Sequence, residues 1–345
     1  MIWPVRETPS RMPCGPTRRS VVVTLGLAAA GVALSGCGIR LEDDAPRVPL
    51  IPTREPVPGE AFLLGLWLGS QDLAGQASAL GGAATALPAR LASLHRTQAG
   101  VLRTLLRGER VPDSVVEDAR RAHTASPSST APSTAGGSTP AGPGTAATTG
   151  SPTAPSRSTL ATAEASALSA ESFAALAALD AETVVSPAAA LAQRATAATL
   201  LGRAPTWPTQ ESVAPGLAAT ALEATRAAVY GFEVVAAQSG GSQRRLATAT
   251  LATLRARVAR LEEPAGEAAT PPALGYPLPF AVTTPGAARR LALHVLDGLR
   301  AGRAAASGSA AGDATGLAAT VQWLAEAERL GHQWGMPLQP FPGLE

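Results

Sequence analysis

Residues 216–238 read GLAATALEATRAAVYGFEVVAAQ, and this stretch decides the expected fold class. Its larger apolar residues, among them Leu222, Val229 and Val234, recur at the spacing of one face of an α-helix. The paired glycines at 240–241 then interrupt the pattern. The stretch therefore predicts an amphipathic helix of about six turns.

The same signature recurs on both sides of this stretch. Thr284 followed by Pro285 and Asp313 are typical helix starts, Ser242 is a third candidate cap, and Pro264 is expected to end a helix. Eight helices are predicted, over residues 60–80, 88–107, 160–181, 187–201, 216–238, 243–263, 285–305 and 314–331. Ala and Leu dominate while aromatic residues make up 3%, which argues against β-sheets. An all-α fold follows.

The composition excludes several classes of protein. A formal net charge of +2 over 345 residues, with 28 basic and 26 acidic side chains, argues against a nucleic-acid binder. Two cysteines are too few for a disulfide scaffold or a multi-cysteine metal site. No nucleophile elbow, phosphate loop or dinucleotide fingerprint occurs, so the sequence indicates no reaction and no cofactor.

The first 36 residues are predicted to be an export signal. Arg18 and Arg19 precede an apolar run over residues 21–34, which has the length of a signal-peptide core and is too short for a comfortable membrane span. The arginine pair resembles a twin-arginine signal, although Val21 and the two valines after it replace the expected continuation. Export by the general secretory route is the alternative. Cys14 would leave with the signal.

The apolar run ends in Leu34, Ser35, Gly36 and Cys37, which resemble a bacterial lipobox. In that chemistry a small residue precedes the cleavage point, and the cysteine thiol carries diacylglycerol. The resemblance implies a mature protein anchored by Cys37 to the outer face of the cell membrane, because two acyl chains give stable anchoring. A chance cysteine after a hydrophobic stretch is the competing interpretation.

Composition divides the rest of the chain. Proline recurs in the stretch after Cys37, as expected for an extended tether, and a later stretch of Ser, Thr, Ala, Pro and Gly is expected to be disordered. The predicted parts are a signal peptide (1–36), a tether (37–59), a helical hairpin (60–123), a linker (124–158), a helical pair packing with that hairpin (159–204) and a helical bundle (213–345).

Three motifs in the last part carry a family resemblance. They are ALEATRAAVYGFE at 221–233, PPALGYPLPF at 271–280 and PFPGL at 340–344, and GIRLEDDAPR at 38–47 is a fourth near the mature start. Together they resemble a ferritin-like domain of unknown function found in actinobacterial lipoproteins. The resemblance covers mainly residues 213–345 and implies a four-helix bundle without an established activity. Tyr276 and Phe280 are expected to pin the connection between two helices.

A ferritin-like bundle can house a di-iron centre, which needs inward carboxylates and Glu-x-x-His motifs. No Glu-x-x-His occurs here, and Thr225 stands where the resemblance implies an acidic residue. The remaining weak candidate ligands are Glu223, Glu233, His294 and Glu326, with Asp297, Glu328 and His332. The competing interpretation is that these are surface side chains of amphipathic helices, the usual position of a helical Glu.

The other histidines and the basic helix favour structural roles. His95 is expected to be a boundary residue bonded to a neighbour, with a role as a ligand as the alternative. His294 is expected to pair with Asp297, and His123 to be solvated. Arg255, Arg257 and Arg260 are expected to form a solvated face, with anionic lipid or a partner as the alternative.

The sequence predicts an exported, membrane-anchored envelope lipoprotein that binds an envelope protein or serves structurally. A metal or redox protein with an atypical di-iron site is the alternative. A solute-binding lipoprotein with α/β lobes is disfavoured, because no strand signal is present.

Overall fold

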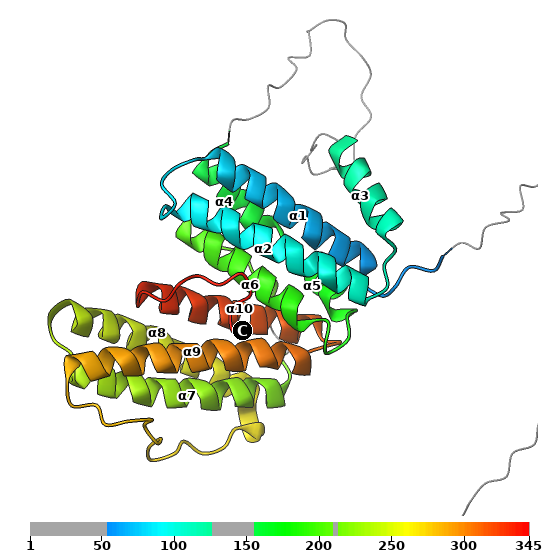
Figure 1. Ribbon diagram of the computed structural model, residues 1–345. Helices are drawn as coiled ribbons and strands as arrows, with labels where there is room; N and C mark the ends of the chain where they lie inside the picture. Colours follow the sequence, from blue (N-terminus) through cyan, green and yellow to red (C-terminus); the bar gives the residue numbers. More distant parts are fainter. Residues whose placement is uncertain (1–53, 126–154, 210–212, 345) are drawn as a thin grey trace, which may run out of the picture. The chain divides into compact units, whose positions relative to one another are not determined.

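The computed structural model describes residues 54–125, 155–209 and 213–344 of the chain. Within these ranges the protein contains ten α-helices and one short 3₁₀ helix, and it contains no strand (Figure 1). The predicted all-α class is confirmed. None of the described helices is both long enough and apolar enough to cross a membrane.

The helices fall into an earlier and a later set along the chain. The earlier set is α1 (Glu60–Ala79), α2 (Leu87–Gly108), α3 (Asp113–Ala125), α4 (Arg157–Ser166), α5 (Ala170–Ala177) and α6 (Val185–Leu200). The later set is α7 (Pro215–Ala237), α8 (Gly241–Ala265), α9 (Pro285–Ser309) and α10 (Ala314–Gln333), with the 3₁₀ turn at Gly266–Ala268.

Three features of the earlier set differ from the prediction. The expected helix over 160–181 is two helices, because Ser169 accepts a hydrogen bond from the backbone N–H of Ser172 and starts α5. Helix α3 was not predicted; it begins directly after Pro112. Helices α3 and α4 therefore extend to Ala125 and from Arg157, slightly into the predicted linker at 124–158. Residues 126–154 of that linker lie outside the described residues.

Most of the predicted caps in the later set are present. Thr284 accepts a hydrogen bond from the N–H of Ala287, and Asp313 accepts one from the N–H of Thr315. Ser242 is not a cap, which corrects the prediction: extended Gly240 precedes the helix, so α8 begins at Gly241. Pro264 lies inside the last turn of α8 rather than after it.

Helix α6 lies at the centre of the described fold. All of its residues from Pro187 to Ala198 are buried, as expected for a helix surrounded by others. It packs against α4 on one side and α10 on the other, while α1 pairs with α2, α7 with α8, and α9 with both α7 and α10 (Figure 1). Alanines on α6 allow the neighbouring backbones to approach closely.

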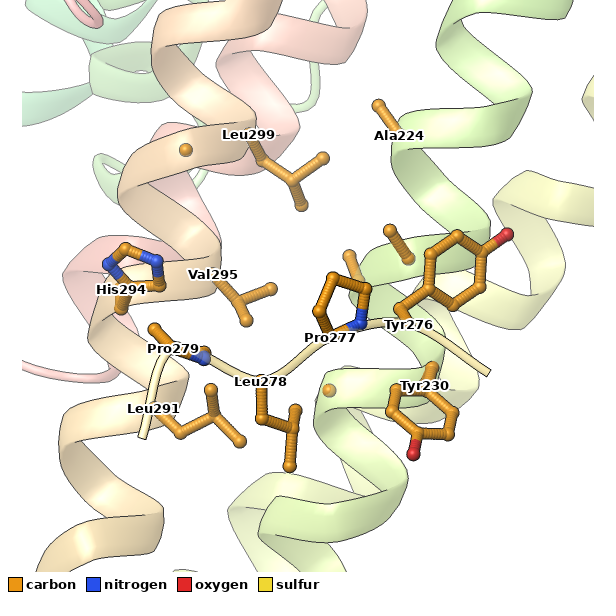
Figure 2. A pocket seen from close by; sticks show the side chains of 14 residues that line it. Ala224, Tyr230, Tyr276, Pro277, Leu278, Pro279, Leu291, His294, Val295 and Leu299 are labelled. Carbon is orange, nitrogen blue, oxygen red and sulfur yellow. The ribbon is translucent and has the colours of Figure 1, made fainter. Parts of the chain in front are cut away.

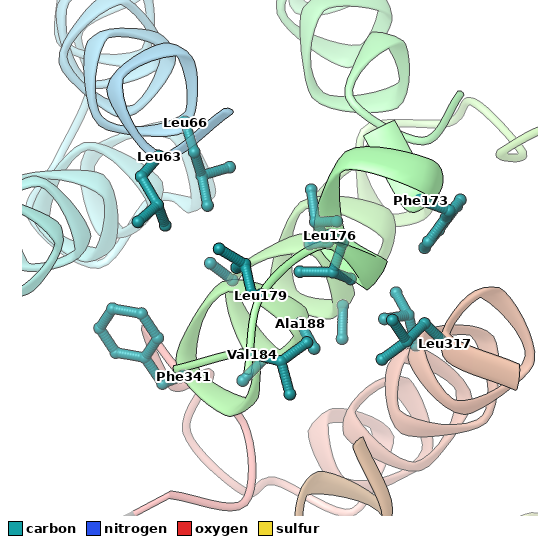
Figure 3. Close-up of a cluster of buried hydrophobic side chains, with 14 of the residues drawn as sticks. Leu63, Leu66, Phe173, Leu176, Leu179, Val184, Ala188, Leu317 and Phe341 are labelled. Atoms are coloured by element: carbon teal, nitrogen blue, oxygen red, sulfur yellow. The ribbon is translucent and has the colours of Figure 1, made fainter. Parts of the chain in front are cut away.

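One hydrophobic cluster joins the two sets of helices. Leu63 of α1, Phe173 of α5, Leu317 of α10 and Phe341 of the C-terminal segment belong to it and are buried (Figure 3). The helical regions predicted over 60–123, 159–204 and 213–345 therefore share a core within one compact unit that spans residues 55–345.

Candidate functional site

A histidine–carboxylate pair lies at the centre of the earlier set of helices. His95 of α2 and Glu164 of α4 are both fully buried, and the His95 Nε2 atom lies 2.7 Å from Glu164 Oε1. Within the described ranges, the second oxygen of Glu164 has no hydrogen-bond partner. His95 was expected to be a boundary residue bonded to a neighbour: it is bonded to neighbours, but it lies in the interior rather than at the boundary.

Two glutamines extend this pair. Gln98 of α2 lies one turn beyond His95, and its Oε1 atom is 2.9 Å from His95 Nδ1. Its amide nitrogen donates to Gln193 Oε1 of α6 at 3.0 Å and to the carbonyl oxygen of Pro340 at 2.7 Å. The network therefore connects α2, α4 and α6 with the C-terminal segment.

A buried arginine follows Gln193 on α6 and is influenced by the charge of Glu164. Arg194 of α6 is 4% exposed, and its Nη2 donates to the carbonyl of Leu66 at 2.9 Å and to Ser70 Oγ at 2.8 Å. Burial lowers the pKa of Arg194 to about 10, and the negative charges of Glu164 and Asp72 oppose that shift. Arg194 thus supplies positive charge in the same interior region as the carboxylate of Glu164.

The later set of helices has a comparable arrangement. Arg300 of α9 and Glu328 of α10 form an ion pair of 2.8 Å that is almost completely buried. Glu328 also accepts a hydrogen bond of 2.9 Å from the backbone N–H of Gln339. Burial alone would lower the pKa of Arg300, but Asp297 and Glu328 raise it above its ordinary value. Arg303 of α9 donates to Thr225 Oγ1 at 3.0 Å.

The weak metal-ligand candidates are not brought together. Glu233 pairs with Arg255 at 2.8 Å, Glu326 pairs with Arg257 at 2.8 Å, and Glu223 lies beside Thr270. Asp297 pairs with Arg300 rather than with His294 as expected, and His332 contacts the carbonyl of Met336. Across the described ranges, no group of three or more His, Cys, Asp or Glu side chains is placed to hold a metal ion.

The donor set therefore does not fit a di-iron centre. Such a centre needs several carboxylates converging on two cations. Here Glu328 forms an ion pair with Arg300, and Glu164 bonds to His95 while its charge opposes the lowering of the pKa of Arg194, so both interior carboxylates are compensated by groups of the protein.

The polar centre formed by His95, Gln98, Glu164 and Gln193 could not be predicted from local spacing, because its residues are far apart in the chain. A separation of 69 residues lies between His95 and Glu164, and no local spacing predicts that contact. One signal was available: Gln193 and Arg194 interrupt an alanine-rich helix whose other polar residues are only Ser and Thr. His123, expected to be solvated, lies 2.7 Å from Asp72 at an exposed position.

An apolar groove with access to solvent lies between α7 and α9. Residues 269–283, which we call the strap, run across it; their four prolines, Pro271, Pro272, Pro277 and Pro279, keep this segment out of a helix. Figure 2 shows the strap crossing from the side of α7 to that of α9, with Leu278 lying between the two helices. The cavity has a volume of about 240 Å³.

Small residues on the facing helices create this groove. Gly231 of α7 lies against Val295 of α9, where an added Cβ atom would be only 2.9 Å from the valine side chain. Alanines at 224, 227 and 228 line the wall on α7, and Leu291, His294 and Leu299 line the wall on α9 (Figure 2). His294 is exposed and makes no hydrogen bond within the described residues.

Aromatic and polar contacts hold the strap in place. The rings of Tyr230 and Tyr276 lie 5.9 Å apart, and Arg290 lies over Phe280 at 5.5 Å, so both strap aromatics pin the connection as expected. Arg226 donates to the carbonyl of Thr270 at 2.8 Å. Burial raises the pKa of Tyr276, and the carboxylate of Glu223 raises it further. The groove is suited to hold an apolar group beside the imidazole of His294.

The roles of the predicted export and anchoring residues stay predictions, because these residues lie outside the described ranges. They are Arg18, Arg19, Leu34, Ser35, Gly36 and Cys37.

Among known proteins, residues 216–345 match the model of a domain of unknown function, DUF4439. No curated protein and no solved structure matches the chain. The C-terminal part is thus a domain of unknown function that includes all of α8, α9 and α10 and the groove.

Proposed function

We propose that this chain is an exported, lipid-anchored envelope protein that binds an apolar group of a partner through the groove under the strap and catalyses no reaction. Its helices form a ferritin-like fold in which the buried polar side chains, such as Glu164 and Glu328, stabilise the protein and bind no metal. The anchor is Cys37, and the proline-rich stretch after it separates the membrane from the folded unit that begins near residue 55.

The observation that carries the proposal is the contrast between the polar interior and the groove. At the two centres, His95, Glu164, Arg300 and Glu328 are buried and bonded to other protein groups, so no reactive side chain there reaches solvent. The groove is open and largely apolar, and His294 at its wall has no hydrogen-bond partner among the described residues. Concave apolar surfaces with few polar groups are typical of binding sites.

The ferritin-like part of the proposal is supported by helix pairing. Helices α7 and α8 pack against each other as one pair, and α9 and α10 as a second pair. Helix α9 also packs on α7, and the strap connects the first pair to the second. A long crossover between two helical pairs is the connection that ferritin-like folds use. The pairing of α1 with α2 and of α4 with α6 repeats this order in the earlier set.

The test of binding is a cross-link formed in intact cells. A photoreactive residue replaces Leu274, the fully exposed residue of the strap, in the anchored protein and in variants of α9. Gly298→Leu fills the groove, since Gly298 lines it and has open space around its Cα atom. We expect the yield of the principal adduct to fall about tenfold, as loss of ~1.4 kcal/mol of binding implies.

Gly302→Leu is the matched control. Gly302 lies one helical turn further along α9, has equally open surroundings and does not line the groove. This variant should retain the adduct of the parent protein. If the adduct is absent from the parent protein, or survives Gly298→Leu unchanged, the groove is not the binding surface.

A further inference from the structure

A separate pocket of about 200 Å³ lies between α6, α8 and α10 and is lined mainly by polar side chains. Its walls include Thr196, Trp207, Arg257, Arg260, Glu326 and Arg329. The proposed function does not use this pocket. Arg257 and Arg260 were expected to form part of a solvated face, but Arg257 is only 6% exposed.

Positive charge exceeds negative charge around this pocket. Among the described residues Glu326 is the one carboxylate that lines it, and its Oε2 atom lies 2.8 Å from the Nε atom of Arg257. Arg303 of α9 does not line the pocket but is buried: burial lowers its pKa to about 10, Glu326 opposes the shift and Arg257 adds to it. Glu326 therefore forms an ion pair with Arg257 alone, and among the described residues Arg303 Nε and Nη1 have no hydrogen-bond partner.

Three further donors in the walls are free. Across the described part of the chain, Arg260 of α8 and Arg329 and Gln322 of α10 make no hydrogen bond or ion pair. The hydroxyl groups of Thr196 and Thr199 are already committed to backbone carbonyls of α6, at 3.0 and 2.9 Å. A ligand would therefore meet guanidinium and amide donors, which suit an acceptor with several oxygen atoms.

We propose that this pocket binds a phosphate group. Guanidinium groups offer parallel N–H donors that match the oxygens of phosphate, and the bonds are strengthened by charge. The excess of arginine over Glu326 favours an anion, and the volume leaves room for a substituent on the phosphate, with the Trp207 ring on one wall. The group can come from a soluble phosphate ester or from a phospholipid headgroup.

The experiment measures binding of two probes to the full chain carrying Cys37→Ala, so that acylation does not bring it to lipid. Glycerol 3-phosphate is titrated by calorimetry, and phosphatidylglycerol vesicles are assayed by co-sedimentation. Arg260→Gln/Arg329→Gln removes the two free guanidinium groups, which are exposed or half-buried and make no hydrogen bond or ion pair with the described residues. Circular dichroism checks that the helices remain.

Arg96→Gln/Arg245→Gln is the matched control, because it removes two exposed arginines without partners that lie outside the pocket. We expect saturable binding of at least one probe, weakened about tenfold or more by the pocket variant and unchanged by the control. Binding of glycerol 3-phosphate identifies a soluble ester as sufficient, and binding of vesicles alone identifies the headgroup. If neither probe binds, or if both variants weaken binding equally, the proposal is wrong.

Discussion

Replacing Glu164 by leucine is expected to lower the free energy of unfolding by about 3–5 kcal/mol, the cost of leaving a buried charge without its counter-charge. Glu164 is fully buried, bonds to His95 at 2.7 Å, and offsets part of the desolvation of Arg194. Its loss leaves the guanidinium of Arg194 in an interior that cannot hydrate it. Urea denaturation followed by circular dichroism measures the change.

A second variant separates charge imbalance from loss of packing. In Glu164→Leu/Arg194→Met both buried charges are replaced by apolar groups, and the joint replacement of opposite buried charges is often close to neutral. We therefore expect the double variant to be more stable than Glu164→Leu alone. Glu117→Leu is the surface control: Glu117 pairs with Arg120 on exposed α3, and its loss should cost less than about 1 kcal/mol.

Two results would contradict this account of the polar centre. One is a Glu164→Leu protein as stable as the parent, which would mean that the buried carboxylate does not compensate Arg194. The other is a double variant whose destabilisation equals the sum of the two single changes, because the two sites would then be energetically independent.

Cys37→Ala is expected to move the protein from the membrane fraction to the soluble or secreted fraction. If Cys37 carries two acyl chains, each buried methylene contributes about 0.8 kcal/mol, and removing the thiol removes the whole anchor. Fractionation of cells followed by immunoblotting measures the distribution. Cys14→Ala is the matched control, since it removes the other cysteine, which lies before the predicted cleavage point and should leave the anchored fraction unchanged.

A membrane fraction that stays constant in Cys37→Ala would remove the lipid anchor from the proposed function. The groove and the arginine pocket would be unaffected by that result, because both are formed by residues of the compact unit that starts near residue 55.

Helix positions were predictable where the sequence carries local signals. Thr284 with Pro285, and Asp313, fix the starts of α9 and α10 through hydrogen bonds within one helical turn, and such bonds depend only on neighbouring residues. The break between α4 and α5 escaped prediction although Ser169 caps the second helix, because alanine-rich sequence continues through the break and hides it.

The candidate sites were less predictable than the helices. The strap was expected to be pinned by Tyr276 and Phe280, and its prolines and aromatic rings are local signals for that role. The polar centre at His95 and the pocket at Arg329 depend on contacts between helices distant in the chain, and periodicity shows only which face of each helix is polar. Arg194 was unexpected because a buried arginine is rare.

The polar interior of this helical protein is structural, and its buried carboxylates are compensated by the protein's own side chains. The decisive measurement is metal analysis of the purified full chain, after incubation with iron, manganese or zinc salts and removal of loosely bound ions. The account predicts well below about 0.1 metal ion per chain, since His95 and Glu164 alone provide too few donors beside Arg194. One or two tightly held ions per chain, lost on Glu164→Leu, would contradict it.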